Sequence, residues 1–212
     1  MYFDDFVSSE SARVEYWDQK LEAWPSFRDA RPNAAHEAAV ALERAGKLLM
    51  VLTQNIDGLH GRAGTSPERL VEIHGTGGAV ECLSCHRRGD PGPRMDSFAE
   101  TRQPPLCSCG GFLKPATISF GQSLRTEDLR RAARAAEECD LVVALGSTLS
   151  VHPAASFPLA AAERGTPYVI VNCGATDHDA HPAVTLRLEG DVVEIVPPAV
   201  DEALARIPPA TG

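Results

Sequence analysis

The sequence predicts an α/β protein with a doubly wound parallel, Rossmann-like sheet and a small inserted zinc-binding module. Apolar strand-like runs alternate with helical patterns, and two cysteine pairs interrupt that order once. The predicted parallel strands cover residues 47–53, 140–145 and 167–172, and we expect the first two to be buried. Each is followed by small or polar residues, and open α/β sheets bind their ligands at the carboxyl ends of strands.

Length and charge limit the possible functions. The 212 residues fit one domain, or one domain with a small insert. A formal net charge of −9 argues against binding through nucleic-acid phosphates and favours basic, lysine-bearing peptides. No apolar run approaches the roughly 20 residues of a membrane span, and no signal peptide opens the chain. We therefore expect a cytoplasmic protein with no membrane partner and no direct nucleic-acid partner.

Helical patterns surround these strands. We expect helices over residues 9–23 and 33–45, from Thr126 onward, over residues 153–164 and around residues 200–207. His36, on the second of them, is predicted to be a hydrogen-bonded structural residue. Residues 186–188 are predicted to form a further short strand.

An amide-rich octapeptide, residues 53–60, follows the first predicted strand. Gln54, Asn55 and Asp57 together can hydrogen-bond an amide and sugar hydroxyls, whereas a structural turn needs only one of them. The alternative is a loop in which Asn and Asp merely make Asx-turns.

His74 ends an apolar stretch shortly downstream. Histidine is the side chain best suited to take a proton near neutral pH. Taken alone, such a histidine is more often structural. Residues 75–78 suggest a dinucleotide-binding turn, but residues 79–81 read as a strand where that fingerprint requires a helix. We therefore reject it.

Residues 82–111 form a cysteine module. Two pairs of thiolates predict a structural Zn²⁺ site with a closed tetrahedral shell, and the predicted ligands are Cys82, Cys85, Cys107 and Cys109. His86 could replace one of them, and unmetallated thiols are the alternative. The segment between the pairs looks too irregular to build a core, so metal would supply folding energy. Cys139 and Cys173 are predicted to be buried small hydrophobes.

Taken in order, these motifs resemble those of the sirtuins, the NAD-dependent protein deacylases. The matching stretches are residues 53–60, His74-Gly75, the two cysteine pairs, residues 118–121, residues 146–149 and Val171-Asn172. The likeness runs from about residue 32 to the end. A sirtuin opens with a strand, a Gly-Ala-Gly-x-Ser turn and a Gly-Ile-Pro-Asp-Phe-Arg-like loop, which nothing here matches. The resemblance thus implies an N-terminally truncated sheet, and we expect the 212-residue chain alone to bind NAD poorly and to turn over little.

The resemblance also implies cofactors, substrate and roles. NAD and Zn²⁺ would be the cofactors and an acyl-lysine peptide the substrate, giving nicotinamide and O-acyl-ADP-ribose. His74 would draw a proton from a ribose hydroxyl. Contacts with NAD would come from Gln54, Asn55, Ile56, Asp57, Gly146, Ser147, Thr148, Asn172 (at the adenosine ribose) and Val192 (by the adenine). Contacts with the peptide and its acyl-lysine would come from Ile118, Phe120 and Gly121, although core packing alone would explain Ile118 and Phe120.

The implied division has three parts. Residues 1–31 would be the helical part of a small domain, residues 82–111 the zinc-binding module, and residues 32–81 and 112–212 the NAD-binding domain. The alternative function is a non-catalytic, zinc-stabilised module that binds peptides or nucleotides. A zinc-ribbon nucleic-acid binder is disfavoured by the acidic charge.

Overall fold

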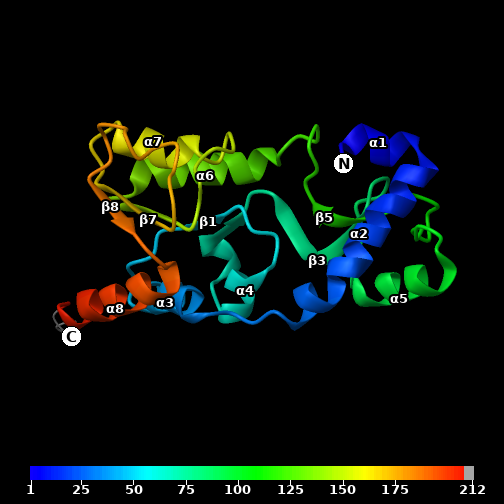
Figure 1. The fold of residues 1–212 in the computed structure, drawn as a ribbon, viewed down its shortest axis with the longest axis horizontal. Coiled ribbons are helices and arrows are strands. Elements are labelled where there is room, and N and C mark those ends of the chain that lie inside the picture. The colour runs from blue at the N-terminus through cyan, green and yellow to red at the C-terminus, as the bar shows by residue number, and fades with distance from the viewer. Residues whose placement is uncertain (208–212) are drawn as a thin grey trace. The chain divides into compact units, whose positions relative to one another are not determined.

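The computed structural model describes residues 1–207, and the chain divides into two compact units. Unit 1 comprises residues 1–31, 53–59 and 72–125, and unit 2 comprises residues 32–52, 60–71 and those from 126 onward. Figure 1 labels the elements of both. Strands β1 (Val51–Thr53) and β2 (Leu70–Glu72) pair with each other, and the chain passes from one unit to the other within each strand. The three-part division implied above stays a prediction.

Unit 1 combines helices with an antiparallel sheet of order β4-β3-β5. Its elements are α1 (Phe3–Ser8), α2 (Glu10–Asp29), β3 (Gly75–Cys82), β4 (Arg88–Gly89), α5 (Gly92–Thr101) and β5 (Leu113–Thr117). Helix α2 begins after Ser9, whose side chain accepts from the backbone N–H of Ala12, as N-cap residues do. It packs against α5 (Figure 1). The helix predicted over residues 9–23 is confirmed and extends further.

The core of unit 1 includes the segment between the cysteine pairs. Met95 and Phe98 of α5 are buried against Trp17 of α2, and Phe98 and Trp17 have no exposed surface. Residues three apart lie on the same helix face, so a single turn supplies both side chains. The prediction that this segment is too irregular to build a core is wrong.

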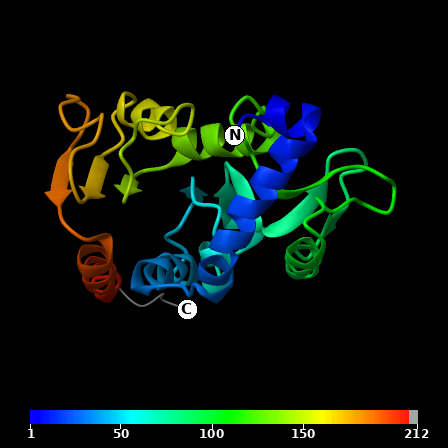
Figure 2. The same cartoon turned by 45° about the vertical axis from the view of Figure 1, so that its right-hand side comes forward.

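Unit 2 is built on a parallel sheet of order β6-β7-β8. Its elements are α3 (Ala34–Arg44), α4 (Leu59–Ala63, whose first residue belongs to unit 1), a 3-10 turn (Pro67–Arg69), α6 (Thr126–Glu138), β6 (Val142–Leu145), α7 (Ser156–Ala162), β7 (Tyr168–Asn172), β8 (Leu186–Glu189) and α8 (Val192–Ala205). Helices α6 and α7 lie on one side of the three strands, and α3 and α8 lie together on the other (Figures 1 and 2). The predicted α/β class with parallel strands is confirmed.

Helix α3 has a capping box at its start. The Asn33 side chain accepts from the backbone N–H groups of Ala35 and His36, and the backbone N–H of Asn33 donates to Nδ1 of His36 at 3.2 Å. The two side chains thus accept from backbone N–H groups that the start of the helix leaves without a helical partner. The structural role predicted for His36, which is 9% exposed, is confirmed.

Two predicted buried strands are less buried than expected. Residues 47–50 lie outside β1, and the backbone carbonyls of Leu48 and Leu49 accept from the Arg69 guanidinium instead of a neighbouring strand. In β6, Val143 is 43% exposed and Leu145 is 39% exposed. Successive strand residues point to opposite faces, and only the face that carries the alternate residues Val142 and Ala144 packs into the core cluster.

Candidate functional site

His74 lies in the turn between β2 and β3 and is held from two sides. Its Nδ1 lies 3.3 Å from the backbone oxygen of Gln54. A carbonyl oxygen only accepts, so this contact places the ring proton on Nδ1 and leaves the lone pair on Nε2. The backbone oxygen of His74 accepts from the N–H of Ile118 at 2.8 Å. Within unit 1 this contact therefore fixes the orientation of the imidazole and its tautomer.

The loop after β1 brings Gln54 next to His74 and also carries the other predicted nicotinamide-side residues. Its backbone is fixed by short contacts, including Gly77 N–H to Ile56 O at 2.7 Å. Oδ1 of Asp57 accepts from the backbone N–H of Leu59 at 2.9 Å and so starts α4. The Asx-turn alternative therefore holds for Asp57, whereas the side chain of Asn55 is exposed. Gln54 and Ile56 are half-buried beside it.

Glycines let the start of β3 approach its neighbours closely. Gly75 has φ +72°, and a Cβ added there would lie 2.1 Å from the backbone oxygen of Ala116. A Cβ at Gly77 would lie 2.7 Å from Cζ of Phe27. Only a residue without a side chain fits these positions. Gly75 thus lies directly against β5 and Gly77 against α2, so the backbone that follows His74 is closely packed.

The predicted substrate segment, residues 118–121, follows β5 directly. Strand β5 ends at Thr117, so this segment lies outside the sheet. Phe120 is 73% exposed, and its ring lies 6.3 Å from the ring of Tyr2. The backbone oxygen of Phe120 accepts from the N–H of Phe3 at 2.9 Å. The segment therefore presents an exposed aromatic side chain, while part of its main chain is already paired within unit 1.

The predicted adenosine-side residues gather at the carboxyl edge of the sheet in unit 2. Asn172 ends β7, and Gly146 follows β6, where its N–H donates to Val171 O at 3.0 Å. A Cβ on Gly146 would lie 3.6 Å from Cγ2 of Val192, at the start of α8. The backbone oxygen of Thr148 accepts from Asp177 N–H at 2.9 Å, while the side chain of Ser147 accepts from Leu149 N–H. All five predicted residues thus belong to unit 2, at or just beyond the ends of its strands.

The four predicted metal ligands converge in unit 1. Their sulfur atoms all lie within 4.8 Å of one another, with Cys82 to Cys109 at 3.6 Å and Cys85 to Cys107 at 3.7 Å. Four sulfurs at about 2.3 Å from one tetrahedral ion would be about 3.8 Å apart. The donor set and its spacing therefore fit Zn²⁺. His86 instead directs Nδ1 to Glu81 at 3.4 Å, so it does not replace a cysteine.

Backbone N–H groups favour the thiolate form of Cys82 and Cys107, whereas the neighbouring thiols raise the pKa of Cys109 to about 11. The Cys109 N–H lowers the pKa of the Cys107 thiol to about 6, and the Cys85 N–H lowers the pKa of Cys82. Thiolates are the form that binds metal. Gly111 allows the two pairs to close, because a Cβ there would lie 2.7 Å from the Cys82 sulfur.

Two basic side chains that the sequence patterns missed are nearly covered. Lys114, 1% exposed, donates from Nζ to the backbone oxygen of Thr117, and burial lowers its pKa to about 8. Arg187 of β8 contacts the loop after Asn172. Neither carries a signal in the sequence, since lysine and arginine are ordinarily surface residues. Cys173, predicted to be buried, is exposed beside that loop, because β7 ends one residue earlier.

Three features together define a class of protein that binds zinc and a nucleotide. They are a parallel α/β unit with polar strand ends, a histidine fixed beside an amide-rich loop, and a cluster of four cysteines. A family model described as the Sir2 family matches residues 1–153. The chain belongs to the Sir2 family. The match begins at residue 1, so the expectation that the likeness starts near residue 32 is wrong.

Relatives and solved structures agree with this family. The NAD-dependent protein deacetylase of Rhodopseudomonas palustris is 38% identical over 199 residues, which cover 93% of this chain and 78% of that protein. The NAD-dependent protein deacetylase of Haloarcula marismortui is 43% identical over 190 residues, which cover 88% of this chain and 72% of that protein. The structure of a Sir2 protein with a p53 peptide and NAD⁺ is similar with a TM-score of 0.86 at 32% identity, covering 95% of this chain and 81% of that one.

Proposed function

We propose that this chain removes acyl groups from protein lysine with NAD, giving nicotinamide and O-acyl-ADP-ribose. The observation that carries the proposal is the His74 imidazole, whose Nδ1 is held by the Gln54 carbonyl so that Nε2 is left as the base. The relatives described above are NAD-dependent protein deacetylases, which supports the same reaction.

His74 and three residues of the loop after β1 have separate roles in this proposal. NAD supplies the ADP-ribosyl group that accepts the acyl oxygen as nicotinamide leaves. Nε2 of His74 takes a proton from a ribose hydroxyl, and Gln54 holds that ribose beside the imidazole. Asn55 and Asp57 orient the nicotinamide and its ribose. Because Gln54 O already orients the imidazole and Ile118 N–H holds the His74 backbone, little reorganisation is needed at the moment of proton transfer.

The acyl-lysine is proposed to bind along residues 118–121. An uncharged acyl-lysine needs an apolar surface, which Ile118 and Phe120 would supply. Gly121, at φ +81°, keeps the backbone open to close approach. The net charge of −9 favours basic peptides around that lysine. The four cysteines would hold Zn²⁺ as a structural ion, because the four sulfurs leave no open coordination position.

Adenosine binding is proposed for the strand ends of unit 2. Asn172 would contact the ribose, Val192 the adenine, and the turn that begins at Gly146 the rest of the nucleotide. A compartment without oxidising conditions suits a cluster of four reduced cysteines, so we also propose a cytoplasmic location. Among residues 1–207, no helix has the length and apolar character needed to cross a membrane.

The experiment measures nicotinamide released from NAD in the presence of an acetylated lysine peptide, and peptide binding in parallel. His74→Ala should abolish release while leaving peptide binding unchanged. His152→Ala is the matched control, because His152 is an exposed histidine bonded only to Ser156 within unit 2. If His74→Ala released nicotinamide as fast as the wild type, the proposal would fail. A chain that binds the peptide but releases no nicotinamide would support the non-catalytic binding module.

A further inference from the structure

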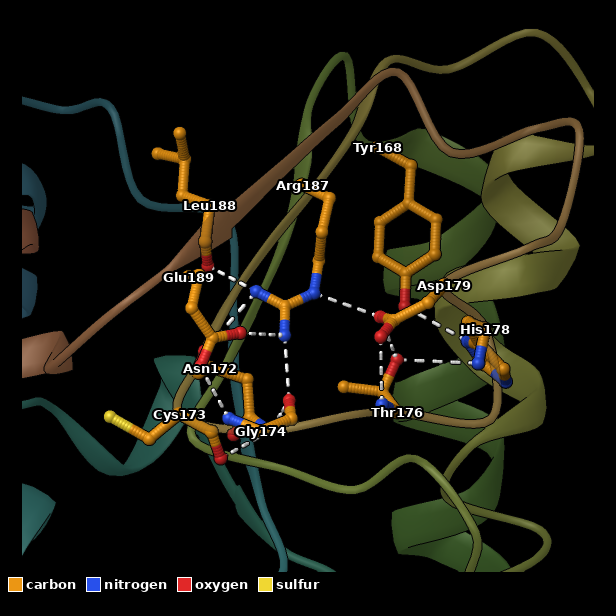
Figure 3. A network of polar contacts seen from close by, with 10 residues as sticks. All are labelled: Tyr168, Asn172, Cys173, Gly174, Thr176, His178, Asp179, Arg187, Leu188 and Glu189. Carbon is orange, nitrogen blue, oxygen red and sulfur yellow. Dashed lines mark hydrogen bonds and ion pairs between the residues drawn. The ribbon is translucent and has the colours of Figure 1, made fainter.

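The guanidinium of Arg187 is saturated by acceptors from its own unit. Nε donates to Asp179 Oδ1 at 2.8 Å, Nη1 to the backbone oxygens of Asn172 and Leu188, and Nη2 to Gly174 O and Glu189 Oε2 (Figure 3). Arginine has five N–H groups, and each of the five meets one acceptor. The side chain is only 19% exposed. Arg187 therefore has no N–H left for a ligand, and its contacts fix the surrounding loop.

The same contacts define what Asn172 can offer. Its Nδ2 donates to the backbone oxygens of Cys173 at 3.2 Å and Gly174 at 2.9 Å, as Figure 3 shows. Its backbone oxygen accepts from Arg187 and from Gly190 N–H. Both amide protons are thus used in holding the loop. Oδ1 is the atom that remains to accept from a ligand hydroxyl.

The charge at this edge of the sheet is negative. Glu189 is the strand partner of Asn172, its side chain is 68% exposed, and Oε1 accepts from Gly174 N–H at 2.7 Å. Asp179 accepts from the Thr176 hydroxyl, which keeps the pKa of this carboxyl below its usual value. With Arg187 counted once, the two carboxylates leave a net charge of −1 beside Asn172.

In nucleotide-binding sheets, an acid at a strand end accepts ribose hydroxyls, whereas a free arginine takes a 2′-phosphate. Here the acid, Glu189, is exposed, whereas all N–H groups of Arg187 are already hydrogen-bonded. We propose that Arg187 is a positioning residue that holds Asn172 for the adenosine ribose and, together with Glu189, makes this subsite select NAD over NADP. The proposal rests on the proposed function, since it takes the adenosine end of NAD to bind at Asn172.

The test titrates the purified chain with ADP-ribose and with ADP-ribose 2′-phosphate to millimolar concentrations. The wild type should prefer ADP-ribose. Arg187→Met should weaken ADP-ribose binding about tenfold, because Asn172 would no longer be held in place and its hydrogen bond to the ribose would be lost. Arg187→Lys keeps the charge but not the five-way geometry, so it should recover only part of the affinity. Glu189→Gln should reduce the ratio of the affinity for ADP-ribose to the affinity for ADP-ribose 2′-phosphate several-fold. Arg134→Met and Glu138→Gln, which break an exposed ion pair in the same unit, should change neither affinity.

Two results would overturn the inference. Equal wild-type affinity for the two ligands would remove the selectivity. An Arg187→Met protein that is less stable but binds both ligands like the wild type would make Arg187 merely structural. Nicotinamide release by wild type and His74→Ala is measured separately, so loss of the proposed reaction and loss of this inference give different outcomes. A wild-type chain that binds neither ligand overturns this inference whatever the reaction assay shows.

Discussion

Adding one methyl group at Gly75 tests whether the contact between β3 and β5 positions His74. The substitution Gly75→Ala puts an alanine at φ +72°, which costs about 1–2 kcal/mol for a residue with a side chain. The new Cβ would lie 2.1 Å from Ala116 O, whereas C–H···O contacts are about 3.3 Å or longer. The two segments must therefore separate by about 1 Å at a point next to the His74 O to Ile118 N–H bond.

The expected loss of stability exceeds the conformational cost alone. Breaking that hydrogen bond and leaving its groups unpaired adds about 1–3 kcal/mol, so Gly75→Ala should cost about 2–5 kcal/mol in total. Gly58→Ala is the matched control in the same unit, since its φ is +68° but an added Cβ would meet nothing closer than 3.7 Å. It should cost only about 1–2 kcal/mol.

Urea denaturation followed by tryptophan fluorescence measures both variants, because Trp17 and Trp24 both belong to unit 1. Nicotinamide release should fall with Gly75→Ala even where the protein is fully folded, since His74 has moved. If Gly75→Ala were no less stable than Gly58→Ala, the close contact with β5 would not be what holds this turn, and the argument would be wrong.

Three further predictions follow from the described contacts. Cys107→Ser should lower the zinc content and the stability of unit 1, as metal analysis and fluorescence melting would show, while Cys173→Ser, outside the cluster, should change neither; equal zinc in both would contradict the site. The pKa of Lys114 falls from 10.5 to about 8 on folding, so between about pH 8 and pH 10.5 the unfolded chain binds more protons than the folded chain. The free energy of unfolding should therefore rise with pH in this range, by up to about 3 kcal/mol. Lys114→Met should remove this rise in urea titrations, and an unchanged pH dependence in the variant would refute the prediction. Phe120→Ala should raise the KM for the acetylated peptide, with stability changed by no more than about 0.5 kcal/mol because the side chain is exposed; an unchanged KM would exclude Phe120 from the peptide site.

Much of the fold could be predicted from short patterns in the sequence. Ser9 and Asn33 cap their helices because a side-chain oxygen next to an apolar repeat satisfies N–H groups wherever it occurs. The parallel strands β7 and β8 were visible as short apolar runs. The four cysteines were visible by spacing alone, since two close pairs can meet around one ion without knowledge of the rest of the chain.

What was missed depends on residues far apart in sequence. Helix α5 lies in a Pro- and Gly-rich stretch, and Met95 and Phe98 become core residues only by packing on Trp17. Arg187 reads as a surface arginine between two leucines, and only folding brings three of its five acceptors to it from residues 172–179. For the site, the sequence predicted only that its residues follow the ends of strands, and not which contacts they make. That Asp57 starts a helix while Nδ1 of His74 faces a carbonyl is a matter of geometry within a few ångströms.

The bond from Phe3 N–H to Phe120 O has a practical consequence for anyone who produces this protein. It sets Met1 and Tyr2 next to the segment proposed to bind the acyl-lysine, so an affinity tag fused ahead of Met1 would crowd that segment. Preparations intended for kinetic work are better tagged at the carboxyl end, or have the amino-terminal tag cleaved.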